Sequence, residues 1–395
     1  MKLLVLLSSY PFPPRVGSSV IAYNNIKELA KKHSVYLICR DEYREPGECN
    51  QFVKNVEFIR PRHQSLFMFL LRGIVNMVLG FPLVITGCQS HELQKRVREL
   101  DKVEQFDAIL VYGIESIQYC PPSSYGRVIA NIEDPQSIKL LRFRKLAVHS
   151  LWEKMKLFVH RVVMAHYEDK LLPKMAKVVL LSRTDISDMQ AQSGYRNLGF
   201  VPYGVDRRKP NEIDRYEQRA DGMIVFSGNM FHLPNVDGAL FFLQDLFPLV
   251  VRDYPSTVLW IVGADPDVRI RDAATRFGEH VVITGRVKDM SYYLKRAKVS
   301  ICPVRLKIGV QTKILEALSW GTPVVTTSAG NSGIGGLSGG ELWVEDDPSL
   351  FAGRVVELLR GKNWEALSKG GRQLVSERFS WENSATELEQ HILQV

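Results

Sequence analysis

Residues 299–327 read VSICPVRLKIGVQTKILEALSWGTPVVTT and carry the strongest fold signal of the chain. Two short apolar runs, Val299–Val304 and Pro323–Thr327, flank a loop and a helical run of about Gln311–Trp320. The helix is expected to stop at the Gly and Pro that follow it. A continuous apolar strand, a helix and a second apolar strand are typical of a parallel sheet buried on both faces.

The same alternation recurs through both halves of the chain. The expected strands are Lys2–Leu7, Ser34–Cys39, Val56–Arg60, Asp107–Tyr112, Arg127–Ile132 and Val178–Ser182 in the first half, and Met223–Ser227, Thr257–Gly263, Val281–Gly285, Val299–Val304 and Pro323–Thr327 in the second. Two sets of this size predict an α/β protein with two doubly wound, Rossmann-like domains.

The boundary between the domains is expected near residues 201–222, where the sequence loses its apolar period and becomes polar, with Pro and Gly. We expect an N-terminal domain over residues 1–203, a second domain over 204–377, and a C-terminal helix within 378–395 that packs back toward the first domain. Two such domains joined by a linker would face each other across a cleft, which is a common place for a ligand.

The composition excludes several classes of protein. Of the 395 residues, 45% are hydrophobic and 24% are charged, which is typical of globular proteins and not of disordered, collagen-like or coiled-coil chains. The five cysteines form no CxxC pair and no Cys/His cluster, which predicts reduced thiols and no zinc site. The start, MKLLVLLSSYPFPPR, has no small-residue cleavage site and is expected to be a first strand rather than a signal peptide.

The charge of the chain is uneven. The formal net charge is +8, and the first 200 residues carry 28 Lys and Arg against 19 Asp and Glu, whereas the rest is nearly balanced. A basic first half suggests an anionic partner, such as a membrane surface or a phosphorylated ligand. Nucleic acid is disfavoured, because no recognisable module accompanies the basic residues. A solvated basic face without a partner remains open.

Two segments bear on membrane contact. Leu66–Ile85 has the length of a membrane span, but Arg72, Asn76 and two helix breakers interrupt it, so that a span, a buried helix–turn segment and a lipid-facing element all remain open. The run Lys139–Arg161 is basic and amphipathic, which favours a surface element; its alternative is a solvated helix with Leu, Phe and Trp packed inward.

The helical run after Gly309 carries the clearest chemistry. Arg305 before the loop and Lys313 in the first turn would meet at a helix N-terminus, where a diphosphate is favoured. Lys313 opposes the helix dipole there, a cost that a bound anion would offset. Spacing alone also allows a solvated Lys313–Glu316 pair at i, i+3.

A weaker anion signal follows the first strand, where Gly17 and Ser18 precede the helical run Ile21–Lys32. Backbone N–H groups at a helix start can face an anion, although such turns also serve as ordinary caps. The stretch is neither a GxGxxG fingerprint nor a P-loop, which disfavours nicotinamide cofactors and Walker-type nucleotide binding.

The run P-V-R-x-x-x-G-x-x-x-K-I-L-E-A-L-S-W-G-T-P-V-V resembles the donor-site signature of retaining GT-B glycosyltransferases of family 4, most closely a bacterial branch linked to cell-surface polysaccharides. Other landmarks follow in the family's order: PYGVD, FSGNMFHLPNVDGALFFL, WIVGADPD and TGRVKDMSYYLKRAKVSICPVR. The resemblance is strong over residues 198–385 and thinner before them. It implies a GT-B fold and transfer of a sugar from a nucleotide-diphosphate donor with retention of configuration.

The resemblance also implies roles for single residues. Arg305 and Lys313 match basic residues near the donor diphosphate, and Glu316 matches the glutamate that binds the ribose hydroxyls. Glu133 and Asp134 stand where the family often has an acceptor-side His or Asp, so these two, with Arg305 and Lys313, are the expected catalytic residues. The other expected donor-binding residues are Gly17, Ser18, Asn229, His232, Gly285, Arg286, Val287, Gly309, Val310 and Gln311.

The chain departs from the family pattern at three places. Ile308 stands where the broader family often has a sugar-contacting glutamate, and Asn229 stands where many relatives have an arginine that grips phosphate. Residues 307–311 replace the Gly-Gly-Gly-Thr-Arg run of the branch. These changes leave the transferred sugar open. They also keep two alternatives, a non-catalytic nucleotide-sugar-binding subunit and a nucleotide-sugar epimerase.

Asp265-Pro266-Asp267 has the form of a metal–diphosphate motif of the other glycosyltransferase fold, but its place inside a doubly wound domain predicts a solvated turn. We expect no metal and no cofactor, only a nucleotide-sugar co-substrate, with UDP as the favoured nucleotide. The expected reaction is metal-independent hexosyl transfer to a saccharide acceptor, lipid-linked, in cell-surface polysaccharide assembly. The expected location is the cytoplasm, at the anionic inner face of the plasma membrane.

Overall fold

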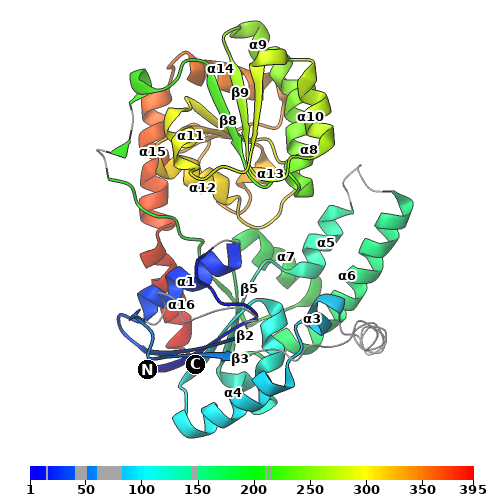
Figure 1. Ribbon diagram of the computed structural model, residues 1–395, viewed down its shortest axis with the longest axis vertical. Helices are drawn as coiled ribbons and strands as arrows, with labels where there is room; N and C mark the ends of the chain where they lie inside the picture. The colour runs from blue at the N-terminus through cyan, green and yellow to red at the C-terminus, as the bar shows by residue number, and fades with distance from the viewer. Residues whose placement is uncertain (15–16, 41–50, 60–81, 145–149, 210–211, 214) are drawn as a thin grey trace. The chain divides into compact units, whose positions relative to one another are not determined.

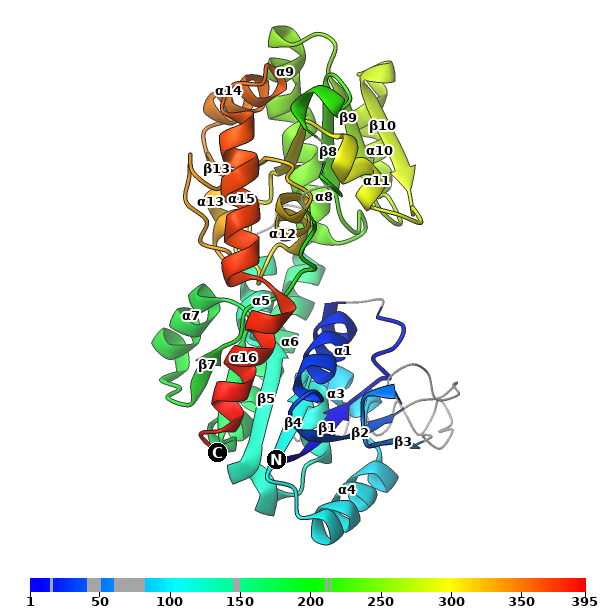
Figure 2. The ribbon, with the colours of Figure 1, turned by 90° about the vertical axis from the view of Figure 1, so that its left-hand side faces the viewer.

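The computed structural model describes residues 1–14, 17–40, 51–59, 82–144, 150–209, 212–213 and 215–395. The chain divides into two compact units, one made of Met1–Gly204 with Trp381–Val395 and one made of Val205–Ser380. Each unit is built around its own parallel sheet (Figures 1 and 2). The first unit is therefore assembled from both ends of the chain, whereas the second is one continuous stretch.

The first unit contains a seven-stranded sheet in the order β3-β2-β1-β4-β5-β6-β7, and all of its pairings are parallel. Leu4 of β1 lies opposite Tyr36 of β2 and Ile109 of β4. The strand order reverses between β1 and β4, which makes this pair the switch point of a doubly wound sheet. The strands are β1 (Lys2–Leu7), β2 (Ser34–Arg40), β3 (Asn55–Ile59), β4 (Ala108–Tyr112), β5 (Val128–Glu133), β6 (Lys177–Leu180) and β7 (Leu198–Phe200).

Helices pack on this sheet around a core that includes Phe106, Tyr119 and Tyr167. The last helix of the chain lies beside the first helix (Figures 1 and 2), where Ser384 donates a hydrogen bond of 3.0 Å to Asn25. The helices are α1 (Gly17–Leu29), α3 (Leu83–Gly87), α4 (His91–Glu104), α5 (Gln136–Phe143), α6 (Leu151–Leu171), α7 (Arg183–Ser193) and α16 (Trp381–Ile392).

The second unit contains a six-stranded sheet in the order β10-β9-β8-β11-β12-β13, again parallel throughout. Its order reverses between β8 and β11, so this sheet is also doubly wound. Its strands are β8 (Met223–Ser227), β9 (Val258–Val262), β10 (Val281–Gly285), β11 (Val299–Cys302), β12 (Val324–Thr326) and β13 (Trp343–Val344).

The helices of the second unit surround a core with Phe226, Phe242, Phe247, Phe351 and Trp364. They are α8 (Leu233–Phe241), α9 (Phe247–Asp253), α10 (Val268–Thr275), α11 (Ser291–Arg296), α12 (Thr312–Ser319), α13 (Ser328–Asn331), α14 (Pro348–Leu359) and α15 (Trp364–Arg378). The expected α/β fold with two doubly wound, Rossmann-like sheets is confirmed.

Two strands were not expected from the sequence. β7 (Leu198–Phe200) and β13 (Trp343–Val344) have three and two residues and lie at the outer edges of their sheets. Runs this short have no period that could distinguish a strand from a loop. The final helix begins at Trp381, three residues after the position from which a C-terminal segment was expected.

The basic run Lys139–Arg161 contributes to two helices, α5 and α6, and residues 145–149 lie outside the described residues. The alternative of inward packing is wrong for the first turns of α6, because Leu151, Trp152 and Phe158 are exposed. Most of the stretch 66–85 also lies outside the described residues. Within the described ranges, none of the helices is long and apolar enough to cross a membrane.

Candidate functional site

The switch point of the second sheet carries most of the expected donor residues. Gly228 and Asn229 follow β8, while Arg305 and the loop with Gly309 follow β11. In open parallel sheets, ligands bind outside the carboxyl ends of the strands at such a point. The contacts of these residues therefore decide what the second unit can bind.

Two glycines bring the backbone close together here. Gly228 and Gly263 have φ angles of +148° and +154°, and the Gly228 N–H donates to the Val262 carbonyl at 3.0 Å. A Cβ on Gly263 would lie 1.6 Å from the Gly228 carbonyl oxygen, and one on Gly228 would lie 3.2 Å from Cε of Lys313. The turns after β8 and β9 can therefore touch each other and Lys313 only without side chains.

Lys313 lies in the first turn of α12 and is 9% exposed. Its ammonium donates to Oδ1 of Asn235 at 2.5 Å and to Oε1 of Gln311 at 3.3 Å, and it lies over the Phe226 ring. Burial lowers the pKa of Lys313. The alternative of a solvated Lys313–Glu316 pair is wrong, because the ammonium is buried on neutral partners.

Arg305 is held by the same helix that holds Lys313. Its guanidinium forms two hydrogen bonds with the Asp237 carboxylate, of 2.9 and 2.6 Å, and lies over the Phe241 ring. The hydrogen bonds that Arg305 donates to Asp237 raise the pKa of Arg305. The side chain is half exposed, so part of the guanidinium still faces solvent. Side chains of α8 thus hold both Arg305 and Lys313 in place. The charge of Arg305 is balanced by Asp237, whereas Lys313 has no such ion pair among the described residues.

Glu316 lies one turn after Lys313 and is partly buried. Burial raises the pKa of Glu316, and the positive charges of Lys313 and Arg208 oppose that rise. A carboxylate stabilised by two neighbouring cations can accept hydrogen bonds from hydroxyl groups. Its position fits the role that the family resemblance implies.

The loop before α12 has a tight backbone. Gly309 has a φ of +46°, and Gly333 packs so closely that a Cβ on it would meet the Gly309 carbonyl at 2.1 Å and Cα of Val310 at 3.0 Å. Gln311 donates to the Ile308 carbonyl at 3.1 Å while its oxygen accepts from Lys313. The loop thereby connects directly to the buried ammonium.

Asn229 and His232 form the turn between β8 and α8. The Asn229 carbonyl accepts hydrogen bonds from Nδ2 of Asn235 at 2.8 Å and from the His232 N–H at 3.2 Å. Oδ1 of Asn229 accepts from the Phe231 N–H at 3.0 Å. Lys313, Gln311, Asn235 and Asn229 therefore make one connected network.

The turn after β10 lies next to the turn after β9. Gly285 has a φ of +68°, and its carbonyl accepts from the Gly263 N–H at 3.2 Å. A Cβ on Gly285 would meet nothing within 4 Å, so there is open space beside it. Arg286 is 82% exposed and lies 4.0 Å from Asp265, while Val287 is partly buried.

The Asp265-Pro266-Asp267 turn has a structural role at its second carboxylate. Asp267 caps α10 by accepting from the Arg269 N–H at 2.9 Å and also pairs with the Arg269 side chain, whose hydrogen bonds lower the pKa of Asp267 to about 2. Asp265 is exposed. Among the described residues, no group of three or more His, Cys, Asp or Glu could hold a metal ion.

In the first unit, Gly17 is the first residue of α1 and Ser18 the second. The backbone N–H groups of a first helical turn have no partner inside the helix. A Cβ on Gly17 would meet nothing within 4 Å. This helix start therefore has room for a ligand, but no contact in the described residues selects an anion.

Glu133 is the last residue of β5 and has a φ of +62°, next to an irregularity in the β5–β6 pairing. Its Oε1 is buried and has no hydrogen-bond partner among the described residues. Burial raises the pKa of Glu133 to about 7, and the negative charges of Asp134 and Glu115 act in the same direction. A carboxyl group in this state can exchange a proton near neutral pH.

Asp134 differs from its neighbour, because it is paired with Lys139 at 3.2 Å. Across the switch point of the first sheet, the Ser8 hydroxyl donates to the Glu115 carboxylate at 2.7 Å. Glu133 therefore belongs to an acidic group at the carboxyl ends of β1, β4 and β5 that includes Glu115. No local motif in the sequence points to Ser8 or Glu115, since the order of the strands brings them together.

Sequence reasoning also missed Asp237, the partner of Arg305. The available signal was the stretch LPNVDGALFF, in which Asn235 and Asp237 are polar residues inside an apolar helix. Both side chains are buried. Buried polar groups in a helix of this kind need partners, and here the partners are the two cations of the donor signature.

Comparison with known proteins adds to this geometry. The model of the family described as Glycosyl transferases group 1 matches residues 221–361, which lie within the second unit. A relative from Klebsiella pneumoniae, described as an uncharacterized 44.6 kDa protein in the cps region, is 21% identical over 402 residues. The alignment covers 96% of this chain and 95% of that protein.

Solved structures share the fold over the whole chain. Sucrose-phosphate synthase from Thermosynechococcus elongatus has a TM-score of 0.72 at 16% identity, with 100% of this chain and 99% of that chain covered. HepE of Anabaena in complex with UDP and glucose has a TM-score of 0.65 at 13% identity, with both chains fully covered at 100%. The chain therefore has the GT-B fold, and the match of its second unit to the glycosyl transferases group 1 model supports a glycosyltransferase.

Proposed function

We propose that the protein transfers a hexose from a UDP-sugar to a saccharide acceptor with retention of configuration. The observation that carries the proposal is Lys313, a buried ammonium at the switch point whose hydrogen-bond acceptors are the neutral side chains of Asn235 and Gln311. Glu316 interacts electrostatically with Lys313 but does not pair with it directly, and a buried ammonium without a directly paired opposite charge is costly. A diphosphate beside Lys313 would supply that opposite charge. The likeness to HepE, solved with UDP and glucose, supports UDP as the nucleotide.

The donor region offers what departure of a nucleoside diphosphate requires. Negative charge grows on the leaving phosphate, and a positioned cation stabilises it most where water is excluded. Lys313 would hold this charge, and the exposed part of Arg305 would add a second contact. Glu316 would accept hydrogen bonds from the ribose hydroxyls. The open space beside Gly285 would take the base, with Arg286 and Val287 at its edge.

The acceptor side is assigned to the first unit. Glu133, with its pKa of about 7, would accept the proton of the attacking hydroxyl, while Asp134, which pairs with Lys139 at 3.2 Å, would stabilise positive charge on the sugar. Gly17 and Ser18 would face the donor phosphates from α1. We propose that the reaction is metal-independent, because the chain's own cations can carry the diphosphate charge. Turnover should then persist in excess EDTA.

We also propose that the acceptor is lipid-linked and that the protein works at the anionic inner face of the plasma membrane in cell-surface polysaccharide assembly. The cps-region relative supports the pathway class. The exposed apolar face of α6 supports membrane contact: Leu151 is 86% and Trp152 is 59% exposed. The other exposed members of this face are Met155, Phe158, Val159 and Val162.

Basic side chains lie next to the apolar ones on α6. Lys156 lies over the Trp152 ring at 5.3 Å and Arg144 lies over the Phe158 ring at 5.1 Å. An amphipathic helix with aromatic and cationic residues together is typical of elements that lie in a lipid interface. Vesicles of phosphatidylglycerol should therefore sediment the protein more strongly than vesicles of phosphatidylcholine.

The matched test of this surface replaces Trp152 and Phe158 by Ser and, separately, two exposed apolar residues elsewhere, Val103 and Leu337. Only the α6 variant should lose sedimentation with anionic vesicles. Equal sedimentation with both kinds of vesicle, or equal loss in both variants, would remove the membrane part of the proposal.

The transferase proposal is tested first by thermal unfolding with UDP, GDP, ADP, CMP and dTDP. A ligand that binds only the folded state at 100 times its Kd stabilises it by about 2.7 kcal/mol. UDP should raise the melting temperature of the natural chain and not that of Glu316→Ala. No response to any of the nucleotides would contradict the donor site.

Turnover then separates the remaining alternatives. The chain should release UDP from a UDP-hexose only when a saccharide acceptor is present. Nucleotide binding with no turnover would instead identify a binding subunit. A change in the sugar without any acceptor would identify an epimerase.

A further inference from the structure

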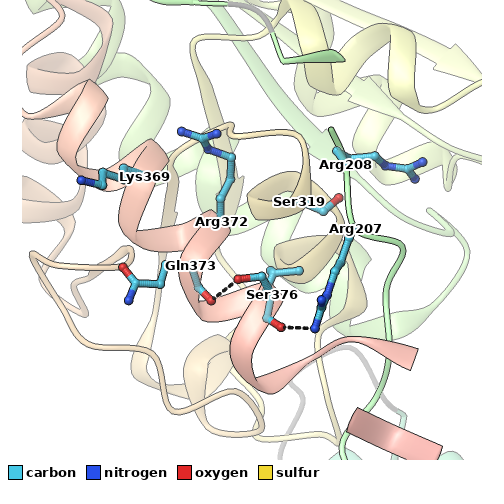
Figure 3. Close-up of a pocket in the computed structure, with 8 residues that line it drawn as sticks. Arg207, Arg208, Ser319, Lys369, Arg372, Gln373 and Ser376 are labelled. Atoms are coloured by element: carbon cyan, nitrogen blue, oxygen red, sulfur yellow. Dashed lines mark hydrogen bonds between the residues drawn. The ribbon is translucent and has the colours of Figure 1, made fainter. Parts of the chain in front are cut away.

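One cavity of the second unit lies beside the proposed donor region, but Lys313, Arg305 and Glu316 are not among the residues that line it. It measures about 380 Å³ and is formed by α15, the end of α12 and the segment after Val205. Figure 3 shows Lys369 and Arg372 on α15, Ser319 at the end of α12, and Arg207 and Arg208 on the connecting segment. The volume lies within the range of small-molecule pockets, which is about 300–1,000 Å³.

Four of the lining side chains are cations, and most of their hydrogen bonds go to neutral groups. Arg207 donates to the Ser376 carbonyl at 2.8 Å and to the Ser380 hydroxyl at 3.3 Å (Figure 3 draws the first of these). Arg372 donates to the Ser368 carbonyl at 3.3 Å. These bonds fix the guanidinium groups without balancing their charge.

Carboxylates near the cavity do not balance its charge. Asp206 lies 3.8 Å from Arg208, and Glu377 accepts a hydrogen bond from the lining residue Gln373. The guanidinium of Arg208 lies over the Trp320 ring, with its Cζ 4.2 Å from the ring centroid, and its Nε is buried with no hydrogen-bond partner among the described residues. Glu316 and Asp289 also interact electrostatically with Arg208. Among the described residues, Arg207, Lys369 and Arg372 form no ion pair, so their donors remain for an anionic ligand.

Two hydroxyl groups suggest a second component of the ligand. The Ser319 hydroxyl donates to the Glu316 carbonyl at 2.7 Å, and the Ser376 hydroxyl donates to the Gln373 carbonyl at 3.0 Å. Each oxygen therefore keeps lone pairs that can accept from a ligand hydroxyl. Guanidinium and ammonium groups are the usual partners of phosphate, while such oxygens suit a polyol.

We propose that this cavity binds a phosphorylated polyol of sugar-phosphate size. The phosphate group would lie among Arg207, Lys369 and Arg372, with the polyol toward Ser319 and Ser376. The proposal does not depend on transferase activity, because none of these residues belongs to the network around Lys313. The two sites are nevertheless connected through α12, which has Lys313 in its first turn and Ser319 as its last residue.

Isothermal titration at constant ionic strength tests the proposal with three probes: glucose 6-phosphate, inorganic phosphate and glucose. Glucose 6-phosphate should bind saturably, inorganic phosphate more weakly, and glucose not at all. The double variant Lys369→Gln/Arg372→Gln should weaken glucose 6-phosphate binding at least tenfold, since two charge-assisted contacts are lost. Both side chains reach the protein surface, so folding is expected to survive, and the melting temperature checks this.

The matched control is Lys95→Gln/Arg98→Gln on α4, an exposed pair with the same spacing, which should leave binding unchanged. Lys313→Met should also leave it unchanged, because that residue belongs to the donor region. Binding that disappears in Lys313→Met and persists in the Lys369/Arg372 variant would place the ligand at the donor region and overturn the proposal. No saturable binding, or equal binding of glucose, would overturn it as well.

Discussion

Lys313 is a buried cation without a directly paired carboxylate in the described part of the chain, and we expect it to bind a ligand rather than to stabilise the fold. Lys313→Met keeps an unbranched side chain and removes the buried charge. We expect the ligand-free free energy of unfolding to change by less than about 1 kcal/mol, because the lost hydrogen bonds are offset by the removal of a costly buried ammonium. The stabilisation by UDP should disappear. Thermal unfolding with and without UDP measures both effects.

Lys298 is the matched control for this prediction. It is also buried, but its ammonium pairs with Asp221 at 2.6 Å and contacts the Tyr216 hydroxyl at 3.1 Å. Lys298→Met should therefore lower the free energy of unfolding by about 2 kcal/mol and leave the UDP response intact. If Lys313→Met were the more destabilising of the two, Lys313 would be a structural residue.

Glu133 is expected to make the stability of the first unit depend on pH. Its pKa of about 7 lies above the ordinary value of 4.5, so between these values the folded chain binds the additional proton and stability falls as pH rises. Glu133→Gln should remove the part of this loss that Glu133 causes. The variant should be more stable than the natural chain by about 1–3 kcal/mol at pH 8 and equal at pH 4. Denaturant unfolding across pH 4–8 checks it.

Glu168, in the same unit, is the control that distinguishes an effect on stability from an effect on the reaction. Burial also raises its pKa to about 7, but its oxygen accepts from the Gln136 N–H at 2.8 Å at the start of α5. Glu168→Gln should reduce the fall in stability between pH 4.5 and pH 7 and leave the pH dependence of transfer unchanged. Glu133→Gln should slow transfer and remove its rise through pH 7. Identical pH–rate profiles for the two variants would exclude Glu133 as the proton acceptor.

Single residues also show what a sequence can and cannot predict about a site. The placement of Lys313 and Glu316 on one short helix could be predicted, because both lie within a single helical run of the sequence. Asp237 could not be predicted as the partner of Arg305, and Glu115 could not be predicted as a neighbour of Glu133. In both cases the two residues are distant in sequence. Strand order and the path of α8 bring them there, and neither is visible in a local pattern.

At the scale of elements, long apolar runs were sufficient to predict strands such as β1 and β8. The edge strands β7 and β13 were not predicted, because pairing with a neighbour, rather than their own pattern, makes them strands. α6 illustrates the converse limit. An amphipathic sequence is expected both for a helix whose apolar face packs inward and for one whose apolar face is exposed. Only the exposure of Trp152 and Phe158 in the structure shows that the apolar face is uncovered in the first turns of α6.

The turns after β8 and β9 form an element whose shape depends on glycine. Gly263→Ala would place a Cβ 1.6 Å from the Gly228 carbonyl at a φ of +154°. We expect a loss of more than about 3 kcal/mol in the free energy of unfolding, or loss of the UDP response if the turn moves instead. Gly353→Ala in α14 is the control, because a Cβ there meets nothing within 4 Å. It should stabilise by about 0.5–1 kcal/mol.

At the scale of the whole molecule, the chain crosses between its units twice. The second unit is the continuous stretch Val205–Ser380, while the first needs α16 from the C-terminus. α16 buries Trp381, Leu388 and Ile392 in the first unit, and its Glu389 pairs with Lys32 at 2.6 Å. The two units should therefore respond differently to the loss of the C-terminus.

A chain that ends at Ser380 tests this asymmetry. Removing α16 takes away the buried Ala385 and three large buried apolar side chains. Each of the three is worth about 1.5–3 kcal/mol, and their sum is comparable to the whole stability of a domain. Hydrogen exchange should show the first unit losing protection while the second unit keeps its protection and its UDP response. A chain that ends at Ile392 loses only the exposed tail, Leu393–Val395, and should match the full chain. If both units lost protection together, the second would not fold independently, and the donor site would require the complete molecule.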